Sequence, residues 1–211
     1  MKEFIKKLIG QKEIFNSGNY WESRYLSGGN SGDGSYGRLA DFKAAFLNKF
    51  IQEKNIHTVV EFGCGDGHQL SLIHYPKYLG LDVSESVIRS CVEKFKNDRS
   101  KSFILYNTPT FFNRQFFTAN LTVSLDVIYH IVEESLYCKY LEDLFATSSG
   151  HVIIYSTNFY KAETIHILHR EFLKYVEENI PTFELVEKIP NPYPGIGCNE
   201  SESGFFIFKI K

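Results

Sequence analysis

Short hydrophobic runs alternate along this chain with segments in which apolar residues recur at helical spacing. The runs predict strands at residues 57–62, 78–82, 102–106, 121–125 and 151–156. The helical spacing predicts helices at residues 39–54, 69–74, 84–97, 133–146 and 163–178. Strands that alternate with helices are typical of βαβ units, so this pattern predicts a parallel, doubly wound sheet.

The last part of the chain departs from this alternation. Residues 183–189 and 204–210 both have the pattern of strands, and the Pro- and Gly-rich segment between them contains no helix. Without a crossover helix the two strands should pair antiparallel. The sequence therefore predicts an α/β, Rossmann-like fold: a mostly parallel, seven-stranded sheet with an antiparallel strand pair at its C-terminal end.

The length of 211 residues suits a single domain, which we expect to cover residues 1–211. Residues 1–54 would supply N-terminal helices and a glycine-rich loop at residues 27–37, and residues 55–211 would form a ligand-binding core. Residues 1–9 have the spacing of a short amphipathic helix, which we expect to be docked or lid-like rather than a membrane anchor, because one such turn buries too little apolar area to hold a bilayer. They lack the continuous apolar stretch of a signal peptide.

The composition of the chain argues against several classes of function. The formal net charge of −2 is untypical of a dedicated nucleic-acid binder. No run approaches the roughly 18 apolar residues of a membrane-spanning helix. The four cysteines lie far apart in the sequence, so we expect neither a disulfide framework nor a zinc site, and a cytoplasmic location.

The turn after the first predicted strand carries the clearest chemical signal. Ligands of doubly wound sheets bind beyond the carboxyl ends of the strands, and Gly63, Gly65 and Gly67 allow a sharp bend and a close approach of the backbone to a ligand. Asp82 ends the second strand, 21 residues after Glu61, a distance that suits hydrogen bonds to ribose hydroxyls. These features fit a dinucleotide site or an S-adenosylmethionine site.

The motif Glu61-Phe-Gly-Cys-Gly-Asp-Gly67 resembles the first motif of class I S-adenosylmethionine-dependent methyltransferases, and Gly80-Leu-Asp-Val-Ser84 resembles their second. The antiparallel ending is similar to that of the same family. The segments at residues 20–21, 28–37, 39–43, 124–130 and 152–156 resemble a bacterial subfamily linked to the modification of surface polysaccharides or their precursors.

The resemblance implies a set of residues around the cofactor S-adenosyl-L-methionine. The glycines would surround its methionine and ribose parts, Asp82 would hold the ribose hydroxyls, and Val83 would lie beside the adenine. Asn107 and Thr108 stand where the family often has an acidic residue. The full set comprises Glu61, Gly63, Cys64, Gly65, Gly67, Asp82, Val83, Ser84, Asn107 and Asp126.

Two residues after the fourth predicted strand are candidates for catalysis. His130 can accept a proton near neutral pH, so it is the first candidate for the base that a hydroxyl acceptor requires. A hydrogen-bonded structural histidine is the alternative. Asp126 is the second candidate, either beside the methionyl amino group or beside the acceptor.

The acceptor pocket is predicted from aromatic and basic residues. The glycine-rich loop would act as a lid or cradle a phosphate, with Tyr25 among its pocket walls. His166 and His169 are expected one turn apart on a helix, and a solvated polar face is equally compatible with them. The predicted substrate residues are Tyr20, Trp21, Arg24, Tyr36, Arg38, His166, His169 and Arg170. We expect no metal site, because the two histidines lack an obvious third ligand.

These features predict a methyltransferase that transfers a methyl group to oxygen of a small polar or phosphorylated acceptor, such as a sugar or a surface-glycan precursor. The sequence lacks the Asn/Asp-Pro-Pro-Tyr/Phe signature of enzymes that methylate amino groups of nucleic-acid bases. We expect a small-molecule partner, no nucleic acid and no membrane. The sequence leaves open whether the chain forms a homodimer. The alternatives are a cofactor-binding protein without catalysis and an NAD-dependent oxidoreductase.

Overall fold

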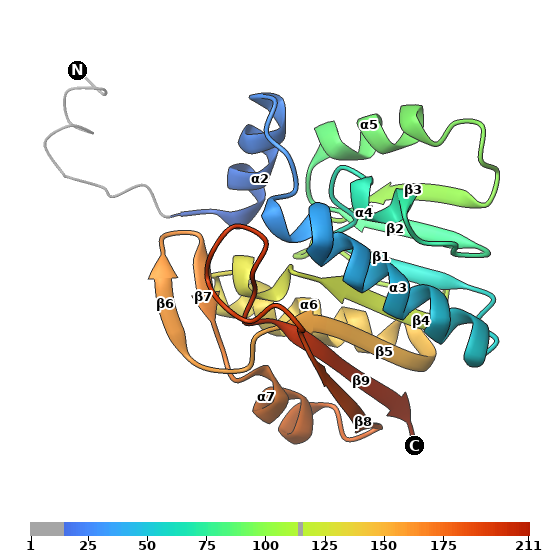
Figure 1. Cartoon of the computed structure of the whole chain (residues 1–211), viewed down its shortest axis with the longest axis vertical. Coiled ribbons are helices and arrows are strands. Elements are labelled where there is room, and N and C mark those ends of the chain that lie inside the picture. Colours follow the sequence, from blue (N-terminus) through green and yellow to red (C-terminus); the bar gives the residue numbers. More distant parts are fainter. Residues whose placement is uncertain (1–14, 114–115) are drawn as a thin grey trace, which may run out of the picture.

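Seven strands form one sheet within residues 15–113 and 116–211, which the computed structural model describes (Figure 1). Their order is β3-β2-β1-β4-β5-β9-β8. The first five strands pair in parallel. They are β1 (Val59–Phe62), β2 (Tyr78–Asp82), β3 (Lys101–Leu105), β4 (Ala119–Leu125) and β5 (Ser148–Ser156).

The two C-terminal strands complete the sheet in the opposite sense. Strand β9 (Gly204–Ile210) lies between β5 and β8 (Phe183–Pro190) and is antiparallel to both. The mostly parallel, Rossmann-like sheet with an antiparallel C-terminal pair is therefore confirmed. The sequence predicted the pairing of these strands, but not that the later strand would take the inner position.

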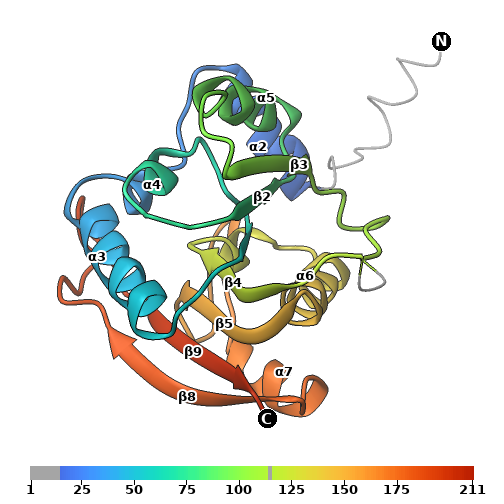
Figure 2. The same ribbon diagram turned by 90° about the vertical axis from the view of Figure 1, so that its right-hand side faces the viewer.

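Helices cover both faces of the sheet (Figure 2). One apolar core lies under α6 (Glu134–Ala146) and α7 (Phe172–Asn179). A second core lies under α3 (Gly37–Glu53) and α4 (His68–Ser71), with α5 (Glu85–Lys94) at its margin. Helix α5 begins where predicted, because Ser84 accepts a hydrogen bond from the amide of Val87 and so caps it.

The N-terminal part contains a helix that hydrophobic periodicity alone did not delimit. Helix α2 (Ser17–Leu26) is capped by Asn16 and is followed by a short 3₁₀ turn, η1 (Asp33–Ser35), inside the glycine-rich loop. A second 3₁₀ turn, η2 (Ile128–His130), follows β4. The predicted helix at residues 1–9 lies outside the described residues.

The predicted helix at residues 163–178 is wrong in its first half. Strands β6 (Lys161–Thr164) and β7 (Ile167–His169) form a two-stranded antiparallel hairpin, and α7 begins only at Phe172. His166 therefore lies at the hairpin tip and His169 on a strand, not one turn apart on a helix. The β-branched residues Thr164, Ile165 and Ile167 favour extended backbone, and this preference outweighed the helical spacing.

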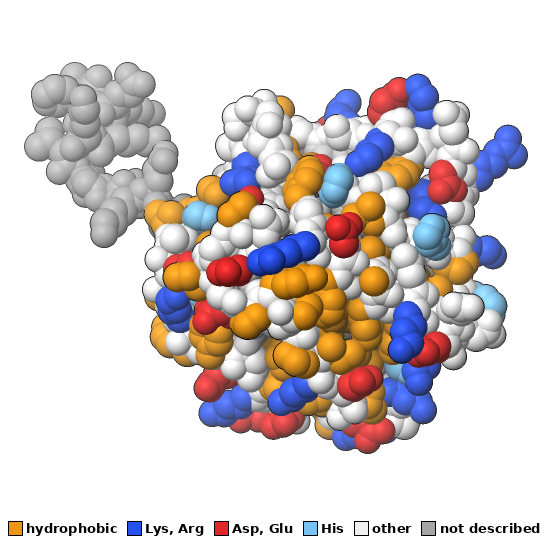
Figure 3. Space-filling view, viewed as in Figure 1, with side chains coloured by type: hydrophobic (Ala, Val, Ile, Leu, Met, Phe, Trp, Pro, Cys, Tyr) orange, Lys and Arg blue, Asp and Glu red, His pale blue; other side chains and the backbone are white. Residues whose placement is uncertain are grey.

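No helix of the described residues is long and apolar enough to span a bilayer. On the face shown in Figure 3, hydrophobic side chains gather where Figure 1 places α3 and the C-terminal strands. Charged side chains surround this region. Phe42, Phe46 and Ile189 pack against the second core while only partly buried.

Phe205 joins helix α3 to the sheet. Its ring centroid lies 4.2 Å from that of Phe46 on α3 and 4.7 Å from that of Tyr155 on β5. We expect Phe205→Ala to lower the free energy of unfolding by about 3–5 kcal/mol, because it leaves a cavity in the second core. Urea denaturation would measure this. The control Ile196→Ala removes a side chain that is 84% exposed and should change stability by less than about 0.5 kcal/mol.

Candidate active site

A cavity of about 470 Å³ lies at the carboxyl ends of the parallel strands. Its wall includes Gly63 after β1, Val83 after β2, Tyr106 after β3 and Asp126 after β4. The sheet order reverses between β1 and β4, because β2 and β3 lie on one side of this pair and β5 on the other. Open α/β sheets bind ligands at such a reversal.

The glycine turn forms one wall of the cavity, and its backbone is crowded by other parts of the protein. Gly63 has a φ of +80°, and a Cβ atom there would lie 2.4 Å from Cγ2 of Val127. Gly65 has a φ of +55°, and a Cβ atom there would lie 2.3 Å from Oγ of Ser31. Both positions therefore require glycine for two reasons: the left-handed backbone and the close neighbours.

Asp82 faces the cavity from the end of β2 and is fixed by backbone amides. The amide of Gly65 donates to its Oδ2 over 2.9 Å and the amide of Ser84 to its Oδ1 over 3.0 Å. Burial raises the pKa of Asp82 to about 6, although these amides act in the opposite direction. Each carboxylate oxygen keeps a further lone pair, so the group can still accept from a diol.

Glu61 is a second buried carboxyl in the cavity wall. The hydroxyl of Tyr78 donates to its Oε2 over 2.7 Å. Burial raises the pKa of Glu61 to about 7, and the hydrogen bond from Tyr78 and the charge of Lys43 only partly offset this. Near neutral pH this side chain is therefore poised between its neutral and charged forms.

A buried ion pair fixes the loop after β4. Nζ of Lys43, a side chain with 0% exposure on α3, lies 2.6 Å from Oδ2 of Asp126. The hydroxyl of Tyr129 donates to the other oxygen, Oδ1, over 3.0 Å. Asp126 has a φ of +59°, which is uncommon for a residue other than glycine and is sustained here by these contacts.

Lys43 has no role in the predicted set, although the sequence contains a signal for it. Position 43 falls on the same helical face as Leu39, Leu47 and Phe50, the face that predicts burial. A lysine on a buried face requires an acidic partner, because an unpaired buried charge is costly. The sequence did not show which carboxylate would meet it.

Residues 16–36, here called the N-terminal cover, contact the glycine turn through Asp66. The amide of Ser31 donates to Oδ2 of Asp66 over 2.9 Å, and the amide of Asp66 donates to Oγ of Ser31 over 2.8 Å. The hydroxyl of Tyr36 also donates to Asp66. Tyr25 shares a hydrogen bond with Ser31 and lines the cavity.

Two further contacts attach helix α2 of the N-terminal cover to the core. Ser17 donates to the carboxylate of Glu133 through both its amide and its hydroxyl. Glu22 accepts hydrogen bonds from the hydroxyls of Ser84 and Ser86. These bonds hold the pKa of Glu22 below its usual value, with Ser84 as the largest cause. The predicted cofactor residue Ser84 is thus occupied by the cover and does not line the cavity.

His130 lies in the cavity wall, beside the indole of Trp21 at a centroid distance of 4.9 Å. Nδ1 of His130 is 3.3 Å from the backbone carbonyl oxygen of His166. A carbonyl can only accept, so Nδ1 carries the proton and Nε2 keeps its lone pair. Burial lowers the pKa of His130 to about 4, so the ring is neutral at physiological pH.

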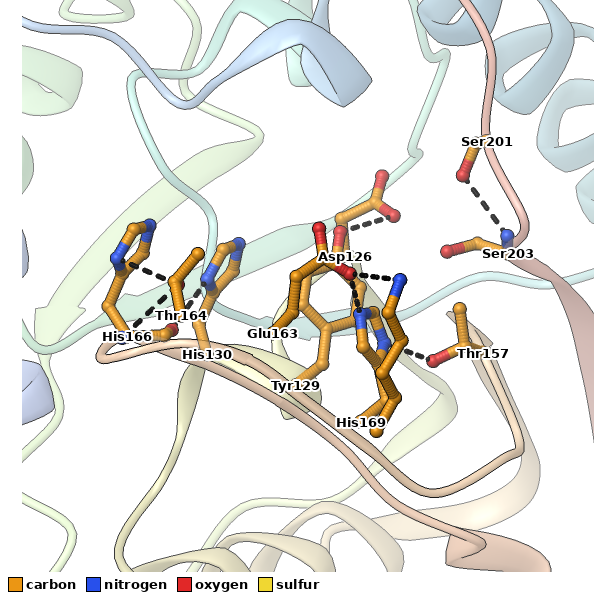
Figure 4. A network of polar contacts seen from close by, with 11 residues as sticks. Asp126, Tyr129, His130, Thr157, Glu163, Thr164, His166, His169, Ser201 and Ser203 are labelled. Carbon is orange, nitrogen blue, oxygen red and sulfur yellow. Dashed lines mark hydrogen bonds and ion pairs between the residues drawn. The ribbon is translucent and has the colours of Figure 1, made fainter. Parts of the chain in front are cut away.

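The β6–β7 hairpin supports this region from outside the cavity (Figure 4). His169 shares a hydrogen bond of 2.7 Å with the hydroxyl of Thr157 and lies 3.3 Å from Oε2 of Glu163. His166 stacks on the ring of Tyr20 at 4.5 Å. The two histidines therefore belong to different contacts, and neither lines the cavity.

The structure brings together only some of the predicted site residues. Those that line the cavity are Trp21, Glu61, Gly63, Cys64, Gly65, Asp82, Val83, Asn107, Asp126 and His130. Those that lie outside its wall are Tyr20, Arg24, Tyr36, Arg38, Gly67, Ser84, His166, His169 and Arg170. The wall also contains residues without a predicted role, such as Glu22, Gln69 and Tyr106.

The basic candidates are occupied by other contacts. Arg24 donates to the carbonyl of Asn30, and Arg38 donates to the carbonyl of Asn199. Arg170 donates to the carbonyls of Ile131 and Val132. Gly67 packs against α5, where a Cβ atom would lie 2.7 Å from the ring of Phe95. In the described residues no three His, Cys, Asp or Glu side chains are grouped as metal ligands.

The same arrangement of strands and helices occurs in solved methyltransferases. The chain matches the N-methyltransferase NodS from Bradyrhizobium japonicum, solved with S-adenosyl-L-homocysteine, with a TM-score of 0.69, 14% identity and coverage of 93% of this chain and 99% of NodS. It matches the methyltransferase domain of bacterial CtHen1-C with a TM-score of 0.63, 19% identity and coverage of 82% of this chain and 99% of that domain. The chain has the class I methyltransferase fold.

One sequence relative also carries a methyltransferase name. The chain is 29% identical over 153 residues to a small RNA 2′-O-methyltransferase from Arabidopsis thaliana. The match covers 67% of this chain but only 16% of the plant protein. No family model matches the sequence.

The raised pKa of Glu61 predicts how the free energy of unfolding depends on pH. The unfolded chain releases this proton near pH 4.5 and the folded protein near pH 7, so folding loses stability as pH rises between these values. The difference corresponds to about 3 kcal/mol. Glu61→Gln, which can still accept from Tyr78, should match the original protein in stability near pH 4.5 and exceed it at pH 8. Urea denaturation across this range would measure both, and a pH-independent difference would contradict the prediction.

Proposed function

We propose that this chain is an S-adenosylmethionine-dependent methyltransferase. The observation that carries the proposal is one cavity that joins the Gly63–Gly65 turn to the carboxylate of Asp82 at the reversal of the sheet. The fold of the matched methyltransferases supports it, and NodS was solved with S-adenosyl-L-homocysteine in place. We also propose that the N-terminal cover acts as a lid that closes the cavity over the cofactor.

The residues of the cavity fit this cofactor from end to end. The free lone pairs of Asp82 suit the ribose hydroxyls, while Val83, Asn107 and Thr108 form the wall on the adenine side. In this proposal the backbone of the glycine turn, which lines the cavity at Gly63 and Gly65, faces the amino-acid end. When bound, the cofactor supplies an electrophilic methyl group, and the protein aligns the acceptor and excludes water.

His130 is the base of the proposed reaction, because its ring is neutral and its Nε2 is free to accept, although burial makes it a weaker base than the sequence alone predicts. Its Nε2 lone pair takes the proton of the acceptor hydroxyl as the oxygen gains the methyl group. The His166 carbonyl keeps the ring in this tautomer. Asp126 is less suited to the role of base, because Lys43 and Tyr129 already donate to its two oxygens. We assign it to the shape and charge of the wall.

The proposed acceptor is a hydroxyl of a small polar molecule, such as a sugar or a surface-glycan precursor with or without a phosphate. The aromatic wall of Trp21 and Tyr25 suits the apolar face of a sugar ring. A ribose 2′-hydroxyl is the second candidate, because the plant relative is named as a small RNA 2′-O-methyltransferase. The net charge of −2 favours the smaller acceptor over a polyanion.

Calorimetric titration tests the cofactor. We expect S-adenosylhomocysteine to bind and NAD not to bind. Asp82→Asn should weaken the binding of S-adenosylhomocysteine about 10- to 100-fold, because it removes the charged acceptor of two hydroxyls. The exposed control Asp98→Asn should bind as the original protein does. Preferential binding of NAD would reject the proposal.

Labelled S-adenosylmethionine tests the reaction. Sugar phosphates, nucleotide sugars and short RNA would be offered in parallel, and the acceptor with the fastest labelling would then be used for variants. His130→Asn keeps a donor for the His166 carbonyl but lacks Nε2, so we expect kcat to fall about 10²- to 10⁴-fold with unchanged binding of S-adenosylhomocysteine. The exposed control His57→Asn should retain full turnover. Unchanged kcat in His130→Asn would exclude His130 as the base.

A further inference from the structure

The tip of the β6–β7 hairpin carries the group that fixes the tautomer of His130. Ile165 and His166 form the two-residue turn between the strands, and the carbonyl oxygen of His166 lies 3.3 Å from Nδ1 of His130. The rings of His130 and His166 are parallel, with centroids 6.0 Å apart and 2° between their planes (Figure 4). The position of the hairpin tip therefore decides which nitrogen of His130 carries the proton.

The hairpin itself has little packing that holds its tip in place. All four residues of β6 are exposed, and Ile165 in the turn is 72% exposed. The buried anchor of the hairpin is His169, which bonds to Thr157 at the end of β7 that lies away from the tip. Because two-stranded hairpins are marginally stable by themselves, the tip needs a contact with another part of the protein to keep one position.

The N-terminal cover makes that contact. The ring of Tyr20 on α2 stacks on the ring of His166, with centroids 4.5 Å apart and 20° between the planes. The next residue, Trp21, meets the ring of His130 edge-on at 4.9 Å and the ring of Tyr20 at 5.6 Å. The four rings thus form a closed circuit, in which each contacts two others, and they come from α2, η2 and the hairpin. Trp21 lines the cavity, whereas Tyr20 lies outside its wall.

We propose that Tyr20 is a positioning residue for His130, which acts by holding the hairpin tip so that the carbonyl of His166 stays on Nδ1. This inference rests on the proposed function, in which Nε2 of His130 is the base. The N-terminal cover then has a second role beside closing the cavity, because it keeps the base in its accepting form through a side chain outside the cavity wall.

The titration of His130 reports whether the tip is in place. The charged and titratable groups that face His130 are Asp126 and Tyr129 after β4, Arg24 on α2 and His166 on the hairpin. Burial is the largest cause of the low pKa of His130, about 4, and it outweighs the hydrogen bond to the His166 carbonyl, which acts in the opposite direction. A ring that loses this burial should have a pKa closer to its ordinary value of 6.5.

¹⁵N NMR spectra of the histidine side chains test the inference without substrate or cofactor, and the signals that His130→Asn lacks identify His130. In the original protein we expect the proton on Nδ1 from about pH 6 to 8 and a titration midpoint of about 4. The variants Tyr20→Ala and His166→Ala remove the stack, and the second keeps the backbone carbonyl. In both we expect a mixture of the two tautomers and a midpoint at least about 1 pH unit higher.

Two control variants leave the stack intact. Tyr20→Phe keeps the ring, and Tyr160→Ala removes a 73% exposed ring just before β6, so both should give the His130 signals of the original protein. Thermal melting would verify that each variant is folded. An unchanged tautomer and midpoint in Tyr20→Ala would overturn the inference, as would a change in Tyr20→Ala that His166→Ala does not share.

Turnover of labelled S-adenosylmethionine distinguishes this inference from the proposed function. We expect kcat of Tyr20→Ala to fall about 10- to 100-fold with unchanged binding of S-adenosylhomocysteine, and the double variant with His166→Ala to fall no further, because both changes remove the same stack. A loss of S-adenosylhomocysteine binding as large as the loss of kcat would assign Tyr20 a structural role and overturn the inference. Absence of methyl transfer in the original protein would reject the proposed function and the role of His130 as base, and the NMR spectra would still decide whether Tyr20 fixes the ring.

Discussion

The ion pair between Lys43 and Asp126 is the interaction on which the geometry of the site depends. It connects the middle of α3 to the loop that follows β4, at a place where neither charge has much access to water. A lysine left without its partner there would cost about 3–5 kcal/mol, so the two elements are held in one relative position. The same helix anchors Gln69 one turn earlier, and the same loop leads to His130. The Lys43–Asp126 ion pair thus fixes two parts of the cavity wall relative to each other, the part next to α3 and the loop after β4.

A second constraint is the shortage of water around the acidic groups. Glu61 and Asp82 are both buried near the cavity, and burial shifts the pKa of each upward. Their hydrogen-bond partners come from the protein itself: Tyr78 for Glu61, and the amides of Gly65 and Ser84 for Asp82. The carboxyls are therefore oriented before any ligand arrives, and a ligand does not have to organise them.

Most of the fold was predictable because it depends on local pattern. The strands at residues 78–82 and 204–210 have the bounds that hydrophobic runs gave, and the lack of a crossover helix predicted the antiparallel pair. The hairpin at residues 161–169 was not predictable in the same way. Its sequence has apolar residues at helical spacing and β-branched residues together, so local pattern supports a helix as well as strands, and in the fold β7 packs beside η2.

The site was predictable where one short segment supplies it, as in the glycine turn and Asp82. It was not predictable where distant segments meet. The partner of Lys43 lies 83 positions away, and Ser31 reaches Asp66 across 35 positions. The predicted basic residues Arg24 and Arg38 do not line the cavity, because their guanidinium groups donate to backbone carbonyls elsewhere. Arg24 donates to the carbonyl of Asn30, and Arg38 donates to that of Asn199. Which carbonyl an arginine meets depends on the conformation of the loops in the folded protein, which the sequence pattern does not give.

The inner position of β9 affects how the sheet is assembled during synthesis. The ribosome makes β8 before β9, yet β8 has no place beside β5 until residues 204–210 fill the gap between them. Until then β5 is an open edge with unpaired backbone groups, and open edges promote association between nascent chains. The sheet is therefore completed out of chain order, and the growing protein remains exposed to misassembly until its ninth strand has emerged.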